Sequence, residues 1–278
     1  MGSGKRLQNP SSLPSSRTVN SKPKFKRKAS KDRRKVNGSN LDEHDRDEVE
    51  GQSADNACQP RDFFLNEFQS ANSVQLSSLE LEAIQVSSFV KISVDGATQG
   101  RKENILSLGK VVKGVFGDCW NETLCEGNLV KREIEAGSPA VLMISTSAIR
   151  SIELLRGVRS MTTKCHGVKL FSKHMKVEEQ VASLKSRVNF ASGTPSRLKK
   201  MIDIEALHLE RLKLLVLDVD PDVKGYSLLT LPQVKDEFWD LYMTYFHHRL
   251  LQAHIKICLF GSFSEGNLRK GKRKSPKD

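Results

Sequence analysis

The chain has 278 residues, with 45 lysines and arginines against 33 aspartates and glutamates, and a formal net charge of +12. No apolar run reaches the roughly 18 residues of a membrane-spanning helix, so we expect no contact with a membrane. Five cysteines without a C-x-x-C pair exclude a disulfide scaffold and argue against a zinc knuckle. A reduced intracellular compartment is the simplest interpretation.

Most of the positive charge lies at the two ends of the chain. Residues 1–40 hold 12 basic side chains and one acid, residues 41–56 have a net charge of −6, and residues 265–278 have one of +4. The interval 57–264 carries only +3. Because apolar residues are scarce at both ends, we expect residues 1–56 and 265–278 to be disordered tails.

Basic residues cluster within the N-terminal tail. Such a cluster on a flexible chain suits an importin groove or a phosphate backbone. We therefore predict a nuclear localisation signal made of Lys22, Lys24, Lys26, Arg27, Lys28, Arg33, Arg34 and Lys35. The acidic block Asp42–Glu50 could mask it in the free protein, and Lys270–Lys274 repeats the basic pattern. The alternative is a pair of solvated linkers of opposite charge.

From residue 140 on, short apolar runs alternate with helical patterns. The predicted strands cover 140–145, 168–171, 188–191, 212–217 and 255–260. The predicted helices cover 147–156, 177–185, 194–202 and 233–253. This alternation is typical of βαβ units, so residues 137–264 are predicted to form a three-layer α/β fold with a parallel sheet. Ligands of such folds bind beyond the carboxyl ends of the strands.

Residues 57–136 have a less regular pattern. Phe63, Phe64, Phe68 and the run Leu76–Ile84 indicate helices. The segments 109–115 and 127–134 contain glycine and indicate short helices or loops. We place no strand here and treat the interval as a mainly helical N-terminal part of the same domain.

The loops at the carboxyl edge of the predicted sheet carry a series of motifs. Gly193-Thr-Pro-Ser-Arg197 at a helix start, followed by a strand that ends in Val216-Leu-Asp-Val-Asp220, resembles motif Ib (T-P-G-R) and motif II (D-E-A-D) of the first domain of DEAD-box helicases. Ser145–Arg150 lies where motif Ia is expected. The resemblance implies a single RecA-like domain of the P-loop NTPase type.

A closer resemblance rests on four segments taken together: ISTSAIRSIELLR, VKLFSKHMKVEEQV, GTPSRLKK and LKLLVLDVD. Their combination, within roughly residues 60–260, resembles the Cms-one ribosomal small subunit homolog family. Its members are degenerate relatives of DEAD-box helicases associated with the small-subunit processome. The resemblance implies a nucleolar pre-ribosome factor whose partners are pre-ribosomal RNA and processome proteins, with no established catalytic activity.

The residues needed for ATP hydrolysis are missing from these motifs. Segments 2–5, 96–103, 109–114 and 266–273 contain glycine, but each fails the spacing, hydroxyl or context that a P-loop requires. Val219 stands where motif II has its catalytic Glu, and an isopropyl group cannot deprotonate a water molecule. We therefore predict no enzyme, no cofactor and no metal site, and a solvated strand end at Asp218, Asp220 and Asp222. The alternative is an active helicase-like NTPase.

The resemblance also implies RNA contacts, because motifs Ia and Ib bind the RNA backbone in DEAD-box domains. A helix N-terminus with a hydroxyl and a guanidinium suits a phosphate. The implied RNA-binding residues are Thr146, Arg150, Thr194, Pro195, Arg197 and Lys199, with Lys200 nearby. Lys173 and His174 replace a Gly-Gly pair that lets RNA approach in that family. The alternative is a solvated basic helix on a purely protein-binding scaffold.

Overall fold

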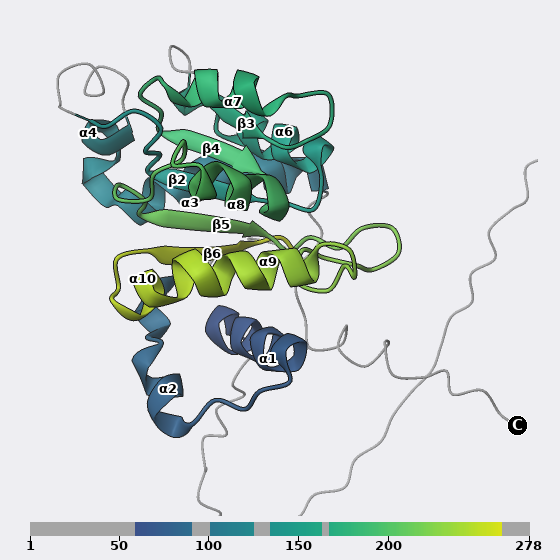
Figure 1. Ribbon diagram of the computed structural model, residues 1–278. Coiled ribbons are helices and arrows are strands. Elements are labelled where there is room, and N and C mark those ends of the chain that lie inside the picture. The colour runs from purple at the N-terminus through teal and green to yellow at the C-terminus, as the bar shows by residue number, and fades with distance from the viewer. Residues whose placement is uncertain (1–58, 91–100, 125–133, 163–166, 263–278) are drawn as a thin grey trace, which may run out of the picture. The chain divides into compact units, whose positions relative to one another are not determined.

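The computed structural model describes residues 59–90, 101–124, 134–162 and 167–262, which belong to one compact unit (Figure 1). The predicted nuclear localisation signal, the acidic block, the C-terminal tail and all but the last residue of segment 127–134 lie outside the described residues. Among the described residues, no helix combines the length and apolar character needed to cross a membrane.

Six parallel strands form one sheet in the order β1-β6-β5-β2-β4-β3. Their bounds are β1 Phe89–Val90, β2 Val141–Ile144, β3 Val168–Leu170, β4 Phe190–Gly193, β5 Leu214–Asp218 and β6 Lys256–Phe260. The central strands are buried on both faces, as parallel strands between helical layers must be. The predicted α/β fold with a parallel sheet is confirmed.

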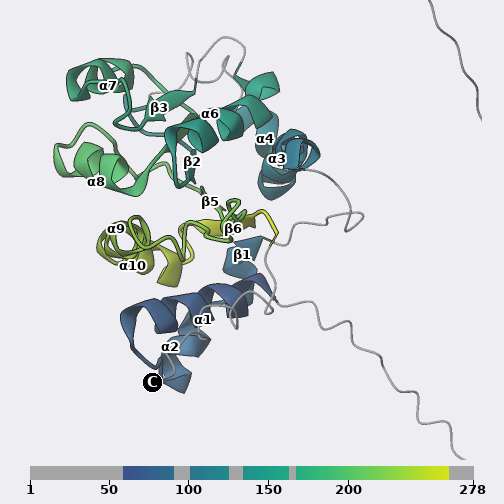
Figure 2. The ribbon, with the colours of Figure 1, turned by 90° about the vertical axis from the view of Figure 1, so that its right-hand side faces the viewer.

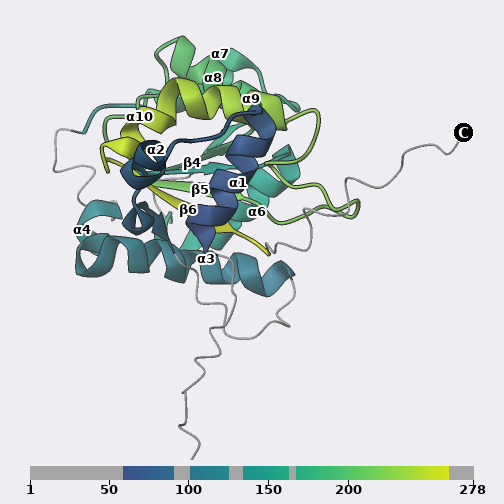
Figure 3. The same cartoon turned by 90° about the horizontal axis from the view of Figure 1, so that it is seen from below.

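Helices cover both faces of the sheet (Figures 2 and 3). On one face lie α1 Pro60–Asn72, α7 Val177–Leu184, α8 Pro195–Asp203, α9 Lys235–Leu241 and α10 His247–Leu251, with the short α2 Ser78–Ala83 beyond α1. On the other face lie α3 Arg101–Phe116, α4 Trp120–Leu124 and α6 Ala148–Gly157. Short 3-10 turns span Val86–Ser88, Gly117–Cys119 and Arg159–Met161.

Strand pleating divides the interior into two apolar cores. Successive side chains of a strand point to opposite faces. In β2, Leu142 and Ile144 therefore pack with α1 and α7–α10, whereas Val141 and Met143 pack with α3, α4 and α6. The same alternation in β5 continues both cores across the sheet, which fixes the three-layer arrangement.

The strand predicted over 188–191 lies two residues further along the chain. Ser192 and Gly193 look like loop residues in the sequence, but both are buried and pair with Met143 and Ile144 of β2. Asn189 precedes the strand and links it to two other segments. Its carbonyl accepts hydrogen bonds from the N–H groups of residues 140 and 141, and its Nδ2 donates to the Leu124 carbonyl at 2.7 Å.

Two features of residues 57–136 were not anticipated from the sequence. β1 is a strand of only two residues, too short for a periodic signal, and it pairs with Ile257 and Cys258 of β6. Residues 109–115 belong to the 16-residue helix α3 rather than to a short helix or loop. Its Gly109 has a packing role, since a Cβ there would stand 3.1 Å from the Gly157 carbonyl oxygen of α6.

The predicted long helix is a continuous run of α9, a π-helical turn Tyr242–Phe246, and α10. Tyr242 and Phe246 in this turn are buried in the core that also contains the aromatic side chains of α1. The Tyr242 ring meets those of Phe64 and Phe68 edge-on, and its hydroxyl bonds to His247 Nδ1 at 3.0 Å. These aromatic contacts join the N-terminal helix to the rest of the domain.

Glu67 on α1 is an unfavourable group in this layer. Its side chain is 6% exposed, burial raises its pKa, and no hydrogen bond or ion pair links it to another described residue. Glu67→Gln is therefore expected to increase the free energy of unfolding at pH 7 by about 1 kcal/mol. Because the folded pKa lies above the unfolded one, this gain is present at neutral pH and disappears below about pH 4, where both states are protonated.

Urea denaturation at pH 7 and pH 4 measures the gain from Glu67→Gln. The matched control is Glu82→Gln on α2, because Glu82 is exposed and should leave stability unchanged. A loss of stability in Glu67→Gln at pH 7 would mean that the carboxylate is solvated or paired in solution.

Candidate functional site at the carboxyl edge of the sheet

The sheet brings the predicted motifs to one edge. β5, β2 and β4 end side by side, which places Ser145 at the end of β2 between Asp218 of β5 and Thr194 after β4. Backbone hydrogen bonds continue past the strand ends: Ser145 N donates to Gly193 O and Thr194 N donates to Leu170 O, both at 3.0 Å. The loops that carry the predicted motifs therefore meet at the carboxyl edge of the sheet, and their role in binding stays a prediction.

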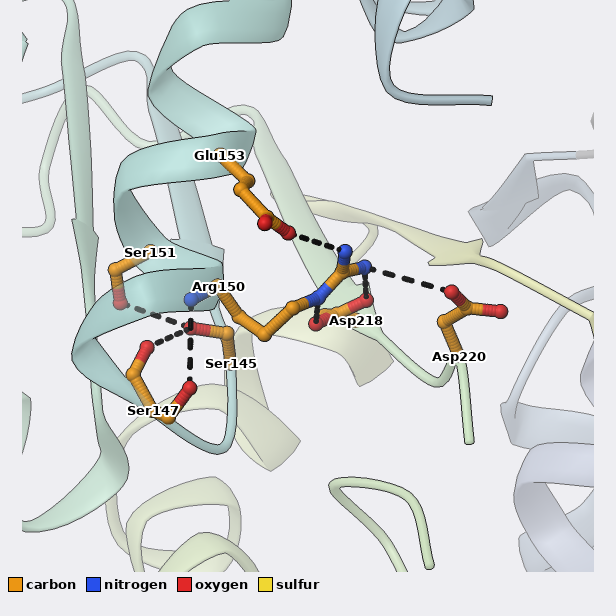
Figure 4. A network of polar contacts seen from close by, with 7 residues as sticks. All are labelled: Ser145, Ser147, Arg150, Ser151, Glu153, Asp218 and Asp220. Carbon is orange, nitrogen blue, oxygen red and sulfur yellow. Dashed lines mark hydrogen bonds and ion pairs between the residues drawn. The ribbon is translucent and has the colours of Figure 1, made fainter. Parts of the chain in front are cut away.

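Serine residues fix the start of α6 at this edge (Figure 4). Ser147 is the N-cap, and its Oγ accepts from the Arg150 N–H at 3.3 Å. Ser145 Oγ lies 2.8 Å from Ser151 Oγ and donates to the Ser147 carbonyl at 3.2 Å. This serine network anchors the first helical turn, from which Arg150 extends toward β5.

Arg150 forms a buried, two-pronged ion pair with Asp218 (Figure 4). Its Nε donates to Oδ2 at 2.7 Å and its Nη2 donates to Oδ1 at 2.6 Å. Nη1 donates to Glu153 Oε2 at 2.7 Å, and Asp220 Oδ2 lies 3.7 Å from Nη2. Arg150 is 7% exposed and Asp218 is 2% exposed. The expectation that Asp218 belongs to a solvated strand end is wrong.

One cation here faces three carboxylates, so the network carries a net charge of about −2. Burial disfavours the charged guanidinium, but the hydrogen bonds and negative charges of Asp218 and Glu153 outweigh it and raise the pKa of Arg150. A polyphosphate at this point of the edge would meet a net negative field. All three guanidinium nitrogens of Arg150 are already engaged, which does not favour the implied RNA contact of this residue.

The residues that match motif Ib lie at the start of α8, as expected. Thr194 occupies the N-cap position with extended backbone, and Pro195 follows as the first helical residue. Pro195 is buried. Thr194 is half-buried, and its side chain makes no capping hydrogen bond. Thr146, from the motif Ia position, is also half-buried.

Two basic side chains of α8, Arg197 and Lys199, interact with other residues of the protein. Arg197 Nη1 donates to Gln180 Oε1 at 2.7 Å, and the buried Gln180 donates to the Phe171 carbonyl at 2.8 Å. Arg197 therefore links α8 to Gln180 of α7, which in turn is bonded to the residue after β3. Lys199 pairs with Asp240 of α9. A hollow of about 320 Å³ beside this pair is lined by Asp203, Glu237, Asp240, Ser196, Lys199 and Lys200, so its charges are mixed.

The loop after β3 keeps an unusual backbone conformation. His174 has a φ of +59°, in the left-handed region that glycine adopts without strain. For a residue with a Cβ this conformation costs about 1–2 kcal/mol. The turn at Lys173 and His174 therefore has a backbone that would suit glycine at position 174.

One group of metal-ligand types lies elsewhere in the described residues. Glu135, His208 and Glu210 place one ligand atom each within 4.8 Å of one another. Both carboxylates are exposed, and exposed acidic groups commonly occur without a metal. The expectation of no metal site stays a prediction.

Comparison with known proteins tests the family resemblance. A profile of the CMS1 family, U3-containing 90S pre-ribosomal complex subunits, matches residues 9–260. The chain belongs to the CMS1 family. The resemblance drawn from the four sequence segments is therefore confirmed.

Curated CMS1-family relatives come from animals and fungi. Protein CMSS1 of Xenopus laevis is 30% identical over 220 residues, which cover 77% of this chain and 72% of that protein. Human CMSS1 is 36% identical over 115 residues, 41% of each chain. Protein CMS1 of Chaetomium thermophilum is 44% identical over 84 residues, 30% of this chain and 34% of that protein. The matches to the human and fungal proteins thus span less than half of their length.

Solved structures similar to this CMS1-family chain include DEAD-box proteins. Saccharomyces cerevisiae Dbp5 bound to RNA and ADP BeF3 is 13% identical, with 72% of this chain and 48% of that chain covered and a TM-score of 0.34. A DEAD box protein from Methanococcus jannaschii is 14% identical, with 75% and 50% covered and a TM-score of 0.35. The chain spans about half of each. These are distant likenesses of fold.

Proposed function

We propose that this CMS1-family chain is a non-catalytic, RNA-associated factor in nucleolar biogenesis of the small ribosomal subunit, where it acts as a docking scaffold. The family's description as subunits of a U3-containing 90S pre-ribosomal complex supports the setting. The observation that carries the absence of catalysis is the buried pair between Arg150 and Asp218.

Asp218 stands where the resemblance to motif II places a metal-binding acid. The corresponding acid of P-loop NTPases holds Mg²⁺ beside the β- and γ-phosphates. Here both carboxylate oxygens of Asp218 accept hydrogen bonds from Arg150, which places a fixed guanidinium at the carboxylate. Val219 follows and offers no base, and it is buried. An internal cation thus stabilises the strand end without a metal or a nucleotide.

In this proposal RNA is bound mainly by the cationic tails. Residues 1–40 and 265–278 carry +11 and +4, whereas residues 57–264 carry +3. Contacts from such tails neutralise phosphates and release counterions, so they depend strongly on salt and carry little sequence information. The cluster within residues 22–35 would direct import through importin, which brings the chain to the nucleus and nucleolus.

ATP turnover by the purified full chain tests the catalytic half of the proposal. With Mg²⁺ and single-stranded RNA present, we expect no phosphate release above a chain-free control. Turnover that scales with chain concentration, and that a folded Asp218→Asn variant lacks, would instead establish the helicase-like NTPase. Circular dichroism of the variant shows whether it is folded.

Crosslinking in cells tests the RNA half. The tagged chain should recover precursor ribosomal RNA and U3 RNA. Replacing the eight predicted localisation cations with glutamine, while a foreign import signal is added, should strongly reduce that recovery without loss of nuclear entry. Absence of both RNAs from the intact chain would contradict RNA association.

A purely protein-binding scaffold is a second candidate, and one observation favours it. Arg197 and Lys199, two of the implied RNA ligands, are paired with Gln180 and Asp240 inside the protein. Under this alternative, the chain would co-purify with pre-ribosomal proteins after nuclease treatment and crosslink to no RNA.

A further inference from the structure

A basic cleft lies away from the motif-bearing edge of the sheet. It has a volume of about 450 Å³ and is formed by the end of α6, the 3-10 turn Arg159–Met161 and β3. Because α6 connects parallel strands, it runs back across the sheet, and its last turn lies near the start of β3. The cleft is therefore separate from Arg150 and from the start of α8.

Three cations lie at this cleft: Arg156, Arg159 and Lys169. All three side chains are exposed, and none has an ion pair or side-chain hydrogen bond within the described part of the chain. Glu153, one turn before Arg156, is already bonded to Arg150. The cleft thus differs from the start of α8, where Arg197 and Lys199 have partners within the protein.

The floor of the cleft is aliphatic. Ile152 and Leu155 of α6 line it together with Gly167, which precedes β3. A Cβ at Gly167 would stand 2.4 Å from Leu155 Cδ2, so the chain passes close to this side chain of α6. The cleft therefore combines an apolar lining with three cations that have no ion pair among the described residues.

The position of the cleft at the C-terminal end of α6 accounts for only one of its three cations. A cation in the last turn of a helix is favoured by the helix dipole, which accounts for Arg156. Arg159 lies in the following turn and Lys169 comes from a different element, the edge strand β3. The helix dipole therefore does not account for the positions of Arg159 and Lys169 at this cleft.

We infer that this cleft binds the sugar-phosphate backbone of single-stranded RNA. Guanidinium forks match phosphate oxygens in geometry and charge, and Arg156 and Arg159 supply two of them. The aliphatic floor offers a surface for a ribose or base between the phosphates. The inference rests on the proposed RNA association and deepens it, because it gives the folded domain an RNA site that is independent of the tails.

The experiment measures binding of a fluorescent 12-nucleotide oligouridine to the full chain by anisotropy. The eight predicted localisation cations are replaced with glutamine in every sample, so that the tail signal is reduced. The cleft variant carries Arg156→Glu, Arg159→Glu and Lys169→Glu. The matched control carries Lys185→Glu, Lys224→Glu and Lys256→Glu, three exposed lysines with the same total change of charge.

The cleft variant is expected to bind at least tenfold more weakly than the matched control. Its affinity should also depend less steeply on salt, with a log–log slope smaller by about 2, as expected for three lost phosphate contacts. A variant with glutamine at the same three positions should also bind RNA more weakly than the matched control, but by a smaller factor than the glutamate variant. Circular dichroism confirms that each variant is folded.

Two results would overturn the inference. Equal RNA affinity in the cleft and control variants would show that the cleft is not used. Binding of fluorescent polyglutamate is measured in the same way. If the cleft variant loses polyglutamate binding while its RNA affinity equals that of the control variant, the occupant of the cleft is an acidic peptide. Failure of the proposed function would look different, because the intact chain with its native tails would then bind no RNA even at low salt.

Discussion

Arg150→Ala is expected to lower the free energy of unfolding by about 3–5 kcal/mol, because it removes the guanidinium that forms a two-pronged ion pair with the buried Asp218. Asp218 is 2% exposed, and both of its oxygens accept hydrogen bonds from Arg150. Glu153 and Asp220, which also lie at this guanidinium, are acids and cannot supply the lost positive charge. The cost is that of a buried carboxylate that loses its ion pair with Arg150.

Urea denaturation followed by circular dichroism measures this loss. Arg156→Ala is the matched control on the same helix, since Arg156 is exposed and its removal should change stability by less than about 0.5 kcal/mol. The double variant Arg150→Met with Asp218→Leu removes both charges and should recover most of the stability. A loss below about 1 kcal/mol in Arg150→Ala would contradict the buried-pair geometry.

Gly193→Ala is expected to destabilise the protein by about 3 kcal/mol, the upper range for overpacking. Gly193 ends β4 and pairs with Leu170 of β3 and Ile144 of β2. A Cβ at this position would stand 2.1 Å from the Leu170 carbonyl oxygen and 2.8 Å from the Leu170 Cβ. Because one of these atoms is backbone, relief requires that β3 move away from β4.

Gly114→Ala on α3 is the matched control for Gly193→Ala. A Cβ at Gly114 would meet nothing within 4 Å, and alanine favours a helix over glycine by about 1 kcal/mol. The two glycine substitutions are therefore expected to shift the urea midpoint in opposite directions. A midpoint unchanged by Gly193→Ala would show that β3 is not held in the described register.

The fold class was predictable because its signals are local. Val141–Ile144 and Leu214–Asp218 are continuous apolar runs, and Pro195 marks a helix start within the sequence itself. β1 escaped prediction because two residues carry no periodicity. The end of β4 escaped because Ser192 and Gly193 are small residues that the neighbouring strands bury.

The site was only partly predictable, for a different reason. The motifs located Thr194, Arg197 and Arg150 at one edge, but their partners come from distant segments. Asp218 lies 68 residues from Arg150, and the contact depends on β5 lying next to β2 in the sheet order. Periodicity identifies strands and helices but not the order of strands, so an arginine that pairs internally looks the same in sequence as one that binds RNA.

The position of β6 has a consequence for how the protein is made. β6 is the last strand of the described residues, yet it lies between β5 and β1, and β1 pairs with it across more than 160 residues. During translation, β1 therefore waits without a partner until residues 256–260 leave the ribosomal tunnel. Pairings this distant in sequence form slowly, and an open strand edge favours aggregation. Until β6 has emerged, the sheet is incomplete and the edge of β5 that β6 will cover stays open.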